Sequence, residues 1–418
     1  MTDYLTRSLP GTGGIFKESA EDFRVEEIPL YLPCGEGEHL YLDVEKTGLT
    51  THDLVRRLAR ALNVRERDIG YAGLKDARAT TRQFVSVPGV TAEQAAGVRI
   101  DGVQILSARL HGNKLRLGHL AGNRFAIRLR HCQPQAAERA QAILEILGRK
   151  GAPNFFGEQR YGALGNSHLI GRAMLSGDYA TAVRTIIGDP EKIRNERWRE
   201  AAERYRAGEP DKALACLPGR MRTERSLLHA LLDGKDHRQA VLRLPRKMLR
   251  LYLSACQSFL FDRLVAARLD ELGTLRAGDL AIKHENGACF LVEDPAKEQE
   301  RADLFEISPT APLFGYKIRL AEGPVGETER ALLAAESIDA DNFDVGRGLS
   351  MPGERRAMRV PLSDYSASAE NDALLVRFAL PRGSYATSVL REIVKDVPAN
   401  KPEGAADGES RAPLCAGA

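Results

Sequence analysis

Cysteine is scarce in this chain, and the cysteines that occur are scattered. There are six among 418 residues, and no two of them form a Cys-x-x-Cys pair. Zinc sites and disulfide frameworks both need regularly spaced cysteines, so neither is expected here. No histidines stand at the spacing of metal ligands, and we expect no metal site. Reduced structural thiols in a cytoplasmic protein fit this usage.

Long apolar runs are missing as well. No stretch approaches the roughly 18 residues that a membrane span needs. The N-terminus, from Met1 to Arg7, lacks the apolar core of a signal peptide. We therefore expect a cytoplasmic protein with no membrane contact, and no feature calls for an obligatory protein partner.

A strong excess of one charge is the third absence. The chain has 60 Lys and Arg against 57 Asp and Glu, which leaves a net charge of only +3. This balance does not by itself indicate a nucleic-acid-binding protein. It does not exclude one either, because the local field follows the distribution of charge rather than its sum.

What is present first is a pattern of strands and helices. Residues 23–28 and 40–45 alternate apolar and polar side chains, as half-buried strands do. Residues 103–110 and 125–130 look similar, and helices are predicted after Thr50 and from about residue 134 to 147. This mixture predicts an α+β domain with a largely antiparallel mixed sheet.

The pattern changes near residue 175 and becomes mainly helical, with a long candidate helix over 247–272. A hairpin is predicted around Asn286-Gly287, and strands return after about residue 335. We therefore predict one discontinuous domain, residues 1–178 and 335–400, interrupted by a mainly helical α+β insert, residues 179–334. The tail, residues 401–418, is small and polar and is predicted to be disordered.

The segment GLKDARATTRQ, residues 73–83, carries the most chemistry. Asp76 directly follows a lysine in a glycine-flanked turn that leads into a predicted strand. An aspartate in such a turn often bonds only its own backbone. Here Arg78 and Arg82 stand close by in the sequence, with threonines and a glutamine that suit a phosphate or a base edge. Asp76 is therefore the candidate catalytic residue.

A second segment, APNFFGEQRYG, residues 152–162, is a loop bounded by proline and glycine. It combines three aromatic side chains with the amide of Asn154. A base that is flipped out of its stack needs an aromatic face to lie on and polar groups for its edge. The alternative, which we favour for Phe155, is that such aromatics pack against their own domain.

Taken in order, these segments resemble the TruD-type tRNA pseudouridine synthases. The segments that carry the resemblance, from residue 15 to residue 392, are IFK with EDFRVEE, GLKD, KLRLGHLAGNRF, PNFFGEQRYG, SACQSFLFD and LPRGSYATSVLRE. The GLKD and PNFFGEQRYG segments are the specific ones. Phe155 and Tyr161 are aromatic exchanges, and Asp262 stands where the family usually has asparagine.

The resemblance implies an enzyme that converts a uridine of tRNA, uridine-13 in the family, into pseudouridine without cofactor or metal. It implies that Asp76 is the nucleophile and that Phe23 packs against the target base. Asn154 would contact the uracil, and Tyr385 would line the base pocket. Residues 179–334 would be the TRUD-type insertion domain.

The chemistry itself leaves the role of Asp76 open. The glycosidic C–N bond must break, and the uracil must turn and rejoin the sugar through carbon. A carboxylate can stabilise a cationic sugar, attack covalently or remove a proton. Lys17 or Lys75 is expected to keep Asp76 ionised, because a nearby cation lowers the pKa of a carboxyl group.

Two other functions compete with this interpretation. A non-catalytic RNA-binding or RNA chaperone protein would need basic and aromatic surfaces but not Asp76. A nucleotide-binding enzyme could use the glycines of residues 11–14, but the Lys-Ser/Thr of a phosphate-binding loop does not follow them. A basic cluster formed by Arg243, Arg246, Lys247 and Arg250 is expected either to hold tRNA or to be an ordinary solvated helix face.

Overall fold

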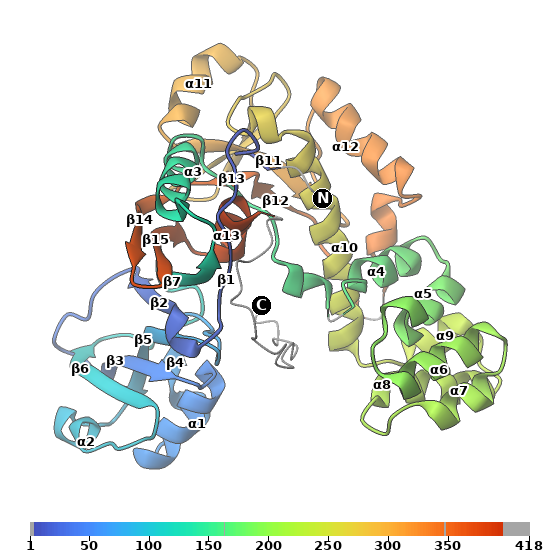
Figure 1. The fold of residues 1–418 in the computed structure, drawn as a ribbon, viewed down its shortest axis with the longest axis horizontal. Helices are drawn as coiled ribbons and strands as arrows, with labels where there is room; N and C mark the ends of the chain where they lie inside the picture. The colour runs from blue at the N-terminus through green and yellow to red at the C-terminus, as the bar shows by residue number, and fades with distance from the viewer. Residues whose placement is uncertain (1–3, 163, 347, 396–418) are drawn as a thin grey trace. The chain divides into compact units, whose positions relative to one another are not determined.

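A computed structural model of the chain describes residues 4–162, 164–346 and 348–395 (Figure 1). The chain divides into two compact units. The sheet unit combines residues 2–153 with residues 360–418, and the inner unit is residues 154–359. The predicted insert, 179–334, falls within the inner unit, and its identity as an insertion domain stays a prediction. The tail, residues 401–418, lies outside the described residues.

The sheet unit is built on a nine-stranded mixed sheet, coloured from blue to cyan and again in red in Figure 1. The strand order is β14–β15–β7–β2–β5–β3–β6, with β1 paired to β7 and β4 paired to β5. Neighbouring strands are antiparallel except β2 and β5, which are parallel. The strands are β1 (Gly13–Ile15), β2 (Phe23–Pro29), β3 (His39–Thr47), β4 (Gly70–Tyr71), β5 (Thr80–Pro88), β6 (Val103–His111), β7 (Leu120–Cys132), β14 (Ser363–Glu370) and β15 (Ala373–Pro381). The predicted α+β class with a largely antiparallel sheet is confirmed.

Helices cover one face of this sheet because its strands alternate. The helical segments are η1 (Ala20–Asp22), α1 (Thr51–Ala61), η2 (Glu66–Asp68), α2 (Ala92–Ala96), α3 (Ala136–Lys150) and α13 (Ala386–Val394). Phe23, Ile127 and Val376 lie in one apolar core with residues of α3 and α13. Leu42 and Val85 lie in a second core with residues of α1. Successive strand side chains point to opposite faces, so the residues between these remain available for other contacts.

The local signals at the start of α1 act as expected. The Thr50 hydroxyl accepts a hydrogen bond from the Asp53 backbone N–H at 3.1 Å, and the Asp53 carboxylate accepts one from the Thr50 N–H at 3.3 Å. This reciprocal pair satisfies two backbone donors that a helix start leaves open. It fixes where α1 begins, close to the loop that carries Asp76.

The two ends of the described chain are joined within the sheet unit. The backbone N–H groups of Leu5 and Thr6 donate to the Glu392 carboxylate at 3.0 and 2.9 Å. Glu392 belongs to α13, and the preceding strand β15 pairs with β7 along nine residues of register. Strand β15 and helix α13, near the C-terminal end of the described chain, are therefore integral to the core of the sheet unit.

The inner unit is mainly helical with a smaller sheet. Its helical segments are η3 (Glu158–Tyr161), α4 (Ser167–Leu175), α5 (Tyr179–Ile187), η4 (Pro190–Lys192), α6 (Glu196–Arg206), α7 (Pro210–Cys216), α8 (Arg222–Leu232), α9 (His237–Leu242), α10 (Arg246–Ala267), η5 (Leu269–Glu271), α11 (Pro295–Asp303), α12 (Gly323–Ala335) and η6 (Ala340–Phe343). Four strands, β9 (Leu280–Lys283), β10 (Cys289–Leu291), β11 (Ile307–Leu313) and β12 (Glu354–Ala357), form a sheet in the order β10–β9–β11–β12. The chain reaches this unit after β8 (Ala152–Pro153) and leaves it within β13 (Arg359–Val360).

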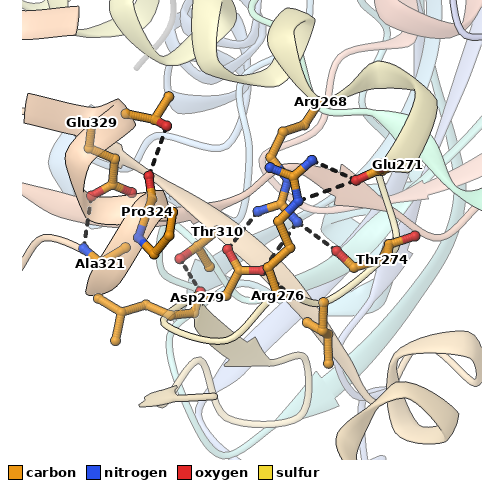
Figure 2. A network of polar contacts seen from close by, with 12 residues as sticks. Arg268, Glu271, Thr274, Arg276, Asp279, Thr310, Ala321, Pro324 and Glu329 are labelled. Atoms are coloured by element: carbon orange, nitrogen blue, oxygen red, sulfur yellow. Dashed lines mark hydrogen bonds and ion pairs between the residues drawn. The ribbon is translucent and has the colours of Figure 1, made fainter. Parts of the chain in front are cut away.

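Two buried ion pairs lie around this smaller sheet, and Figure 2 shows the first of them, between Arg268 and Asp279. Arg268, just after α10, pairs with Asp279 at 2.6 Å and donates to the Thr274 carbonyl at 2.6 Å. Arg355 of β12 pairs with Glu329 of α12 at 2.9 Å. Burial raises the pKa of Glu329, and the charge of Arg355 opposes that rise.

Among the described residues, none of the helices combines the length and the apolar character that a membrane span requires.

Candidate active site

Asp76 lies in the loop between β4 and β5 of the sheet unit. Its Oδ2 accepts a hydrogen bond from Lys17 Nζ at 3.0 Å, which makes an ion pair. The Asp76 side chain is 37% exposed, whereas that of Lys17 is 17% exposed. The carboxylate is therefore accessible to a substrate while its cationic partner is largely covered.

Lys17 has an unusual backbone conformation. It follows β1 with φ at 62°, in the left-handed region that non-glycine residues rarely adopt. Such a conformation costs about 1–2 kcal/mol, so the surrounding fold must hold it. The result is that Lys17 Nζ reaches Asp76 and also lies 4.3 Å from the centroid of the Phe23 ring.

Phe23 begins β2, and its ring is mostly buried. It makes an edge-to-face contact with Phe125, with centroids 6.3 Å apart, and lies 6.5 Å from the ring of Phe16. Phe23 is thus a core residue whose ring also meets the cation of the Lys17–Asp76 pair. The structure brings three of the predicted site residues together, and the contact of Phe23 with a base stays a prediction.

Of the two lysines expected beside Asp76, Lys17 is the one that contacts the carboxylate, and Lys75 Nζ has other partners. Its Nζ forms a buried ion pair with Glu27 of β2 at 3.0 Å and donates to Asn123 Oδ1 at 2.9 Å. Burial raises the pKa of Glu27, and the charge of Lys75 opposes this. Lys75 therefore ties the loop to the sheet, and Lys17 is the cation that contacts the carboxylate.

Lys46 of β3 is a residue that the sequence analysis missed. Its side chain is only 1% exposed, and its Nζ donates to the Asp76 backbone carbonyl at 3.1 Å and to the carbonyl of Leu49. Burial lowers the pKa of Lys46 to about 8, partly offset by the charge of Asp76. A signal was present, because Lys46 shares a strand face with the buried Leu42 and Val44.

The rest of the loop is fixed by α1 and β5. The Thr51 hydroxyl accepts from the Lys75 backbone N–H at 2.8 Å and donates to Gln83 Oε1 at 3.0 Å. Gln83 Nε2 in turn lies 3.4 Å from the Gly73 carbonyl. Lys17 therefore contacts the side chain of Asp76, whereas Lys46 contacts its backbone. The carboxylate is held in place without being buried.

The second predicted segment, residues 152–162, belongs to the inner unit from Asn154 onward. Asn154 is 5% exposed, its Nδ2 donates to the Ala357 carbonyl at 2.8 Å, and its Oδ1 accepts from Arg356 at 2.6 Å. Phe156 packs edge-to-face on Phe261 with centroids 5.8 Å apart. Arg356 was not among the predicted site residues, and its partner Asn154 lies 202 residues away in the sequence.

Asp262, the departure from the family pattern, holds the aromatic loop by two hydrogen bonds. It accepts hydrogen bonds from the Phe156 backbone N–H at 3.0 Å and from the Tyr161 hydroxyl at 2.6 Å. An aspartate can accept both, because an ionised carboxylate offers two acceptor oxygens. The aromatic loop is therefore anchored on α10.

Tyr385 of the sheet unit stands at the N-cap of α13 and is half-buried. Its side chain does not cap the helix, since the start of α13 has no side-chain cap hydrogen bond. Among the described residues, no group of three or more His, Cys, Asp or Glu side chains is placed to hold a metal ion. A base-lining role for Tyr385 stays a prediction.

Comparison with known proteins decides the family. The sequence model of tRNA pseudouridine synthase D (TruD) matches residues 1–393. The chain is 58% identical over 395 residues to tRNA pseudouridine synthase D of Syntrophotalea carbinolica, covering 94% of this chain and 99% of that protein. It is also 58% identical over 393 residues to the protein of the same name from Geobacter metallireducens, covering 94% and 97%. The chain belongs to the TruD family.

A solved structure agrees with the fold of this TruD-family chain. The crystal structure of the putative tRNA pseudouridine synthase D (TruD) from Methanosarcina mazei matches with a TM-score of 0.83 at 27% identity. The match covers 95% of this chain and 97% of the other. Fold class and family are thereby established together, and both agree with the sequence analysis.

Proposed function

We propose that this TruD-family protein isomerises a uridine of tRNA to pseudouridine, with Asp76 as the nucleophile and uridine-13 as the target. The observation that carries the proposal is the Asp76 carboxylate, which is accessible yet paired with Lys17 at 3.0 Å. An aspartate with only a turn role would need neither the largely covered cation of Lys17 nor the three side chains, Lys46, Lys75 and Thr51, that hold its loop.

In the proposed reaction the residues of the sheet unit act on the base and the sugar. Asp76 supplies the electron pair or the negative charge, and Lys17 orients it and balances its charge. Attack on the sugar, attack on the base and proton removal all require the ionised carboxylate. The released uracil must be kept from water while it turns, since water would hydrolyse the intermediate.

Recognition of the base is assigned to aromatic and amide groups. Phe23 and Tyr385 are proposed to face the flipped base, and stacking of this kind contributes about 1–3 kcal/mol per base. Asn154 is proposed to contact the edge of the uracil. We further propose that residues 1–178 and 335–400 form the catalytic domain, whereas 179–334 form the insertion domain, which governs tRNA binding rather than chemistry.

The test is release of tritium from tRNA that carries 5-tritiated uridine, without nucleotide and with EDTA present. A pseudouridine synthase releases tritium because C5 becomes the new glycosidic carbon. An RNA chaperone does not release it, and a nucleotide-dependent enzyme does not act under these conditions. Mapping of the product then checks the position, and tRNA with cytidine in place of uridine-13 should release none above background.

Asp76→Asn is the decisive variant. It keeps the size and much of the hydrogen bonding of Asp76 but removes the charge that the chemistry requires. We expect an unchanged melting temperature, near-normal tRNA affinity and no detectable pseudouridine with enzyme in excess over tRNA. The matched control is Asp68→Asn, because Asp68, the last residue of η2, is also an aspartate paired with a cation, Arg65, at 2.6 Å. Turnover by Asp76→Asn, or its loss in Asp68→Asn, contradicts the assignment.

A further inference from the structure

Strand β12 of the inner unit carries two consecutive arginines that face opposite ways. Successive strand residues point to opposite faces, so Arg355 and Arg356 have different neighbours. Arg355 donates to Thr310 Oγ1 at 2.9 Å and pairs with Glu329 at 2.9 Å. Arg356 instead donates from Nη2 to Asn154 Oδ1 at 2.6 Å. One arginine serves the sheet, and the other contacts a residue that we have assigned to base recognition.

The contacts of Asn154 determine which way its amide points. Its Oδ1 accepts from Arg356, and its Nδ2 donates to the Ala357 carbonyl at 2.8 Å. A guanidinium can only donate and a carbonyl can only accept. Turning the amide over would therefore place the Nδ2 donor against the donor of Arg356. It would also place the Oδ1 acceptor against the carbonyl acceptor of Ala357. The amide has one orientation, and among the described residues Nδ2 donates one hydrogen bond, to the Ala357 carbonyl, although it carries two N–H groups.

Aromatic rings keep Arg356 in place for this contact. Its guanidinium carbon lies 4.5 Å from the ring centroid of Phe156 and 5.6 Å from that of Phe261. Cations over aromatic faces at such distances attract the ring electrostatically. A lysine cannot reproduce this arrangement, because it lacks the flat group that lies on a ring while it donates to an oxygen.

We propose that Arg356 is a positioning residue, which fixes the Asn154 amide so that Asn154 offers an N–H donor to a carbonyl oxygen of the target base. The proposal rests on the proposed function and adds the direction of the hydrogen bond. Uracil carries carbonyl oxygens at both exocyclic positions, whereas cytosine carries an amino group at one of them. A fixed donor favours uracil at that position, and a freely turning amide does not discriminate.

The neighbouring loop has anchors of its own besides its contacts with Arg356. The Phe156 backbone and the Tyr161 hydroxyl are held by Asp262, and Arg160 donates to Ser258 Oγ at 3.1 Å. The loop should therefore keep its fold when Arg356 is replaced. This separates loss of positioning from loss of structure.

The experiment is a double-mutant cycle with kcat and KM for pseudouridine formation as readouts. Arg356→Met is expected to lower kcat/KM about 10- to 100-fold, mainly through kcat, because a misplaced group costs up to about that much. In the Asn154→Ala background the same change should cost less than about 2-fold, since Arg356 acts through Asn154. Arg356→Lys should recover part of the activity, because lysine can still donate to Oδ1.

Arg355→Met is the matched control. It removes an equally charged neighbour on the same strand and breaks the ion pair with Glu329. Arg355→Met should lower the melting temperature. Any fold-loss in kcat/KM that it causes should be the same in the wild-type and the Asn154→Ala backgrounds.

Three outcomes overturn the proposal. They are wild-type kinetics for Arg356→Met, a loss that adds fully to that of Asn154→Ala, and failure of both Arg356→Met and Arg356→Lys to fold. The last would assign Arg356 to structure alone. Failure of the proposed function is distinguishable from all three, because the wild-type protein itself would then release no tritium.

Discussion

Three lysines surround Asp76, and each makes a different contact. Lys17 pairs with the carboxylate, Lys46 donates to the backbone carbonyl, and Lys75 pairs with Glu27. The charge of the Asp76 side chain, the backbone of Asp76 and the loop that carries it are therefore each contacted by a different lysine. Changes at these lysines should therefore give distinct phenotypes, although all three are the same residue type.

Lys17→Met tests the charge contact. Methionine keeps an unbranched apolar chain beside the Phe23 ring but removes the partner of the carboxylate. We expect kcat to fall about 10- to 100-fold, as expected when a charge partner that orients a catalytic group is lost, with tRNA affinity changed only a few-fold. Single-turnover rates and filter binding measure the two effects. An unchanged kcat would show that the ion pair is incidental.

Lys75→Met should act on stability instead. It leaves Glu27 buried without its cation, which typically costs about 3–5 kcal/mol of unfolding free energy. Urea unfolding would measure this loss. The kcat of the protein that remains folded, calculated per titrated active site, should be close to that of the wild type. A stability equal to wild type would contradict the burial of this pair.

Lys46 gives a prediction for pH. Its pKa is lowered from 10.5 to about 8, mainly by burial, while the charges of Asp76 and Asp53 raise it and that of Lys75 lowers it. Between pH 8 and pH 10.5, about the folded and unfolded pKa values, Lys46 is protonated in the unfolded chain and deprotonated in the folded chain. Stability therefore rises with pH across this window, by about 1.4 kcal/mol per unit at most.

The comparison that isolates this effect is wild type against Lys46→Met. Other groups titrate in the same window and cancel in the difference. Urea unfolding at pH values from about 8 to 10.5 should show the wild type gaining stability relative to the variant as the pH rises. A difference that stays flat would mean that Lys46 keeps its proton in the folded protein.

At the scale of elements, the sequence predicts best what is decided locally. The alternation in β2, β3 and β7 and the Thr50–Asp53 pair at the start of α1 are read from neighbouring residues. The long helix was predicted to reach Leu272, but α10 ends at Ala267. Arg268 leaves the helix and pairs with Asp279, a contact that the local pattern does not show.

The same reasoning explains what was foreseen in the site. Asp76 and Asn154 stand in segments with an unusual local composition, so they were found. Which lysine would meet Asp76 depended on a contact between residues 59 positions apart, and Arg356 contacts Asn154 across 202 positions. Patterns in a single sequence do not predict contacts between residues so far apart in the chain. Lys46 alone carried a local signal, as a charge at a buried strand position.

A glycine in β7 gives a prediction at this scale. A Cβ on Gly122 would lie 2.2 Å from the Leu380 carbonyl of β15, so the two strands could not keep their approach. We expect Gly122→Ala to lower the unfolding free energy by about 1–3 kcal/mol, as overpacking does. Gly112→Ala is the control, because no atom lies within 4 Å of its added methyl group. Equal stability of the two variants, measured by urea unfolding, would refute the steric argument.

At the scale of the whole molecule, binding and chemistry are separate predictions. Arg243, Arg246, Lys247 and Arg250 are all exposed, at or just before the start of α10 in the inner unit. Replacing Lys247 and Arg250 with glutamate should weaken tRNA binding. It should also flatten the salt dependence, by up to about one unit of slope for each phosphate contact removed. Filter binding across a salt series measures both.

The control is an equal change of charge elsewhere in the same unit. Arg194 and Arg197 are exposed near the start of α6, and their replacement by glutamate alters the net charge by the same amount. This control should leave the slope of the salt dependence unchanged. Equal effects of the two pairs would mean that only the overall charge matters, and no effect of either would make the basic cluster an ordinary solvated surface.

The discontinuity of the sheet unit has a consequence for protein synthesis. Strand β7 ends at Cys132, and its partner β15 begins only at Ala373, roughly 240 residues later. At about 5–20 residues per second, a ribosome needs about 10 to 50 s to make that stretch. During this time the inner unit is completed and free to fold. The edge of β7 that later pairs with β15 stays unpaired and can pair with other chains. The nascent protein is therefore most in need of a chaperone after its inner unit has already emerged.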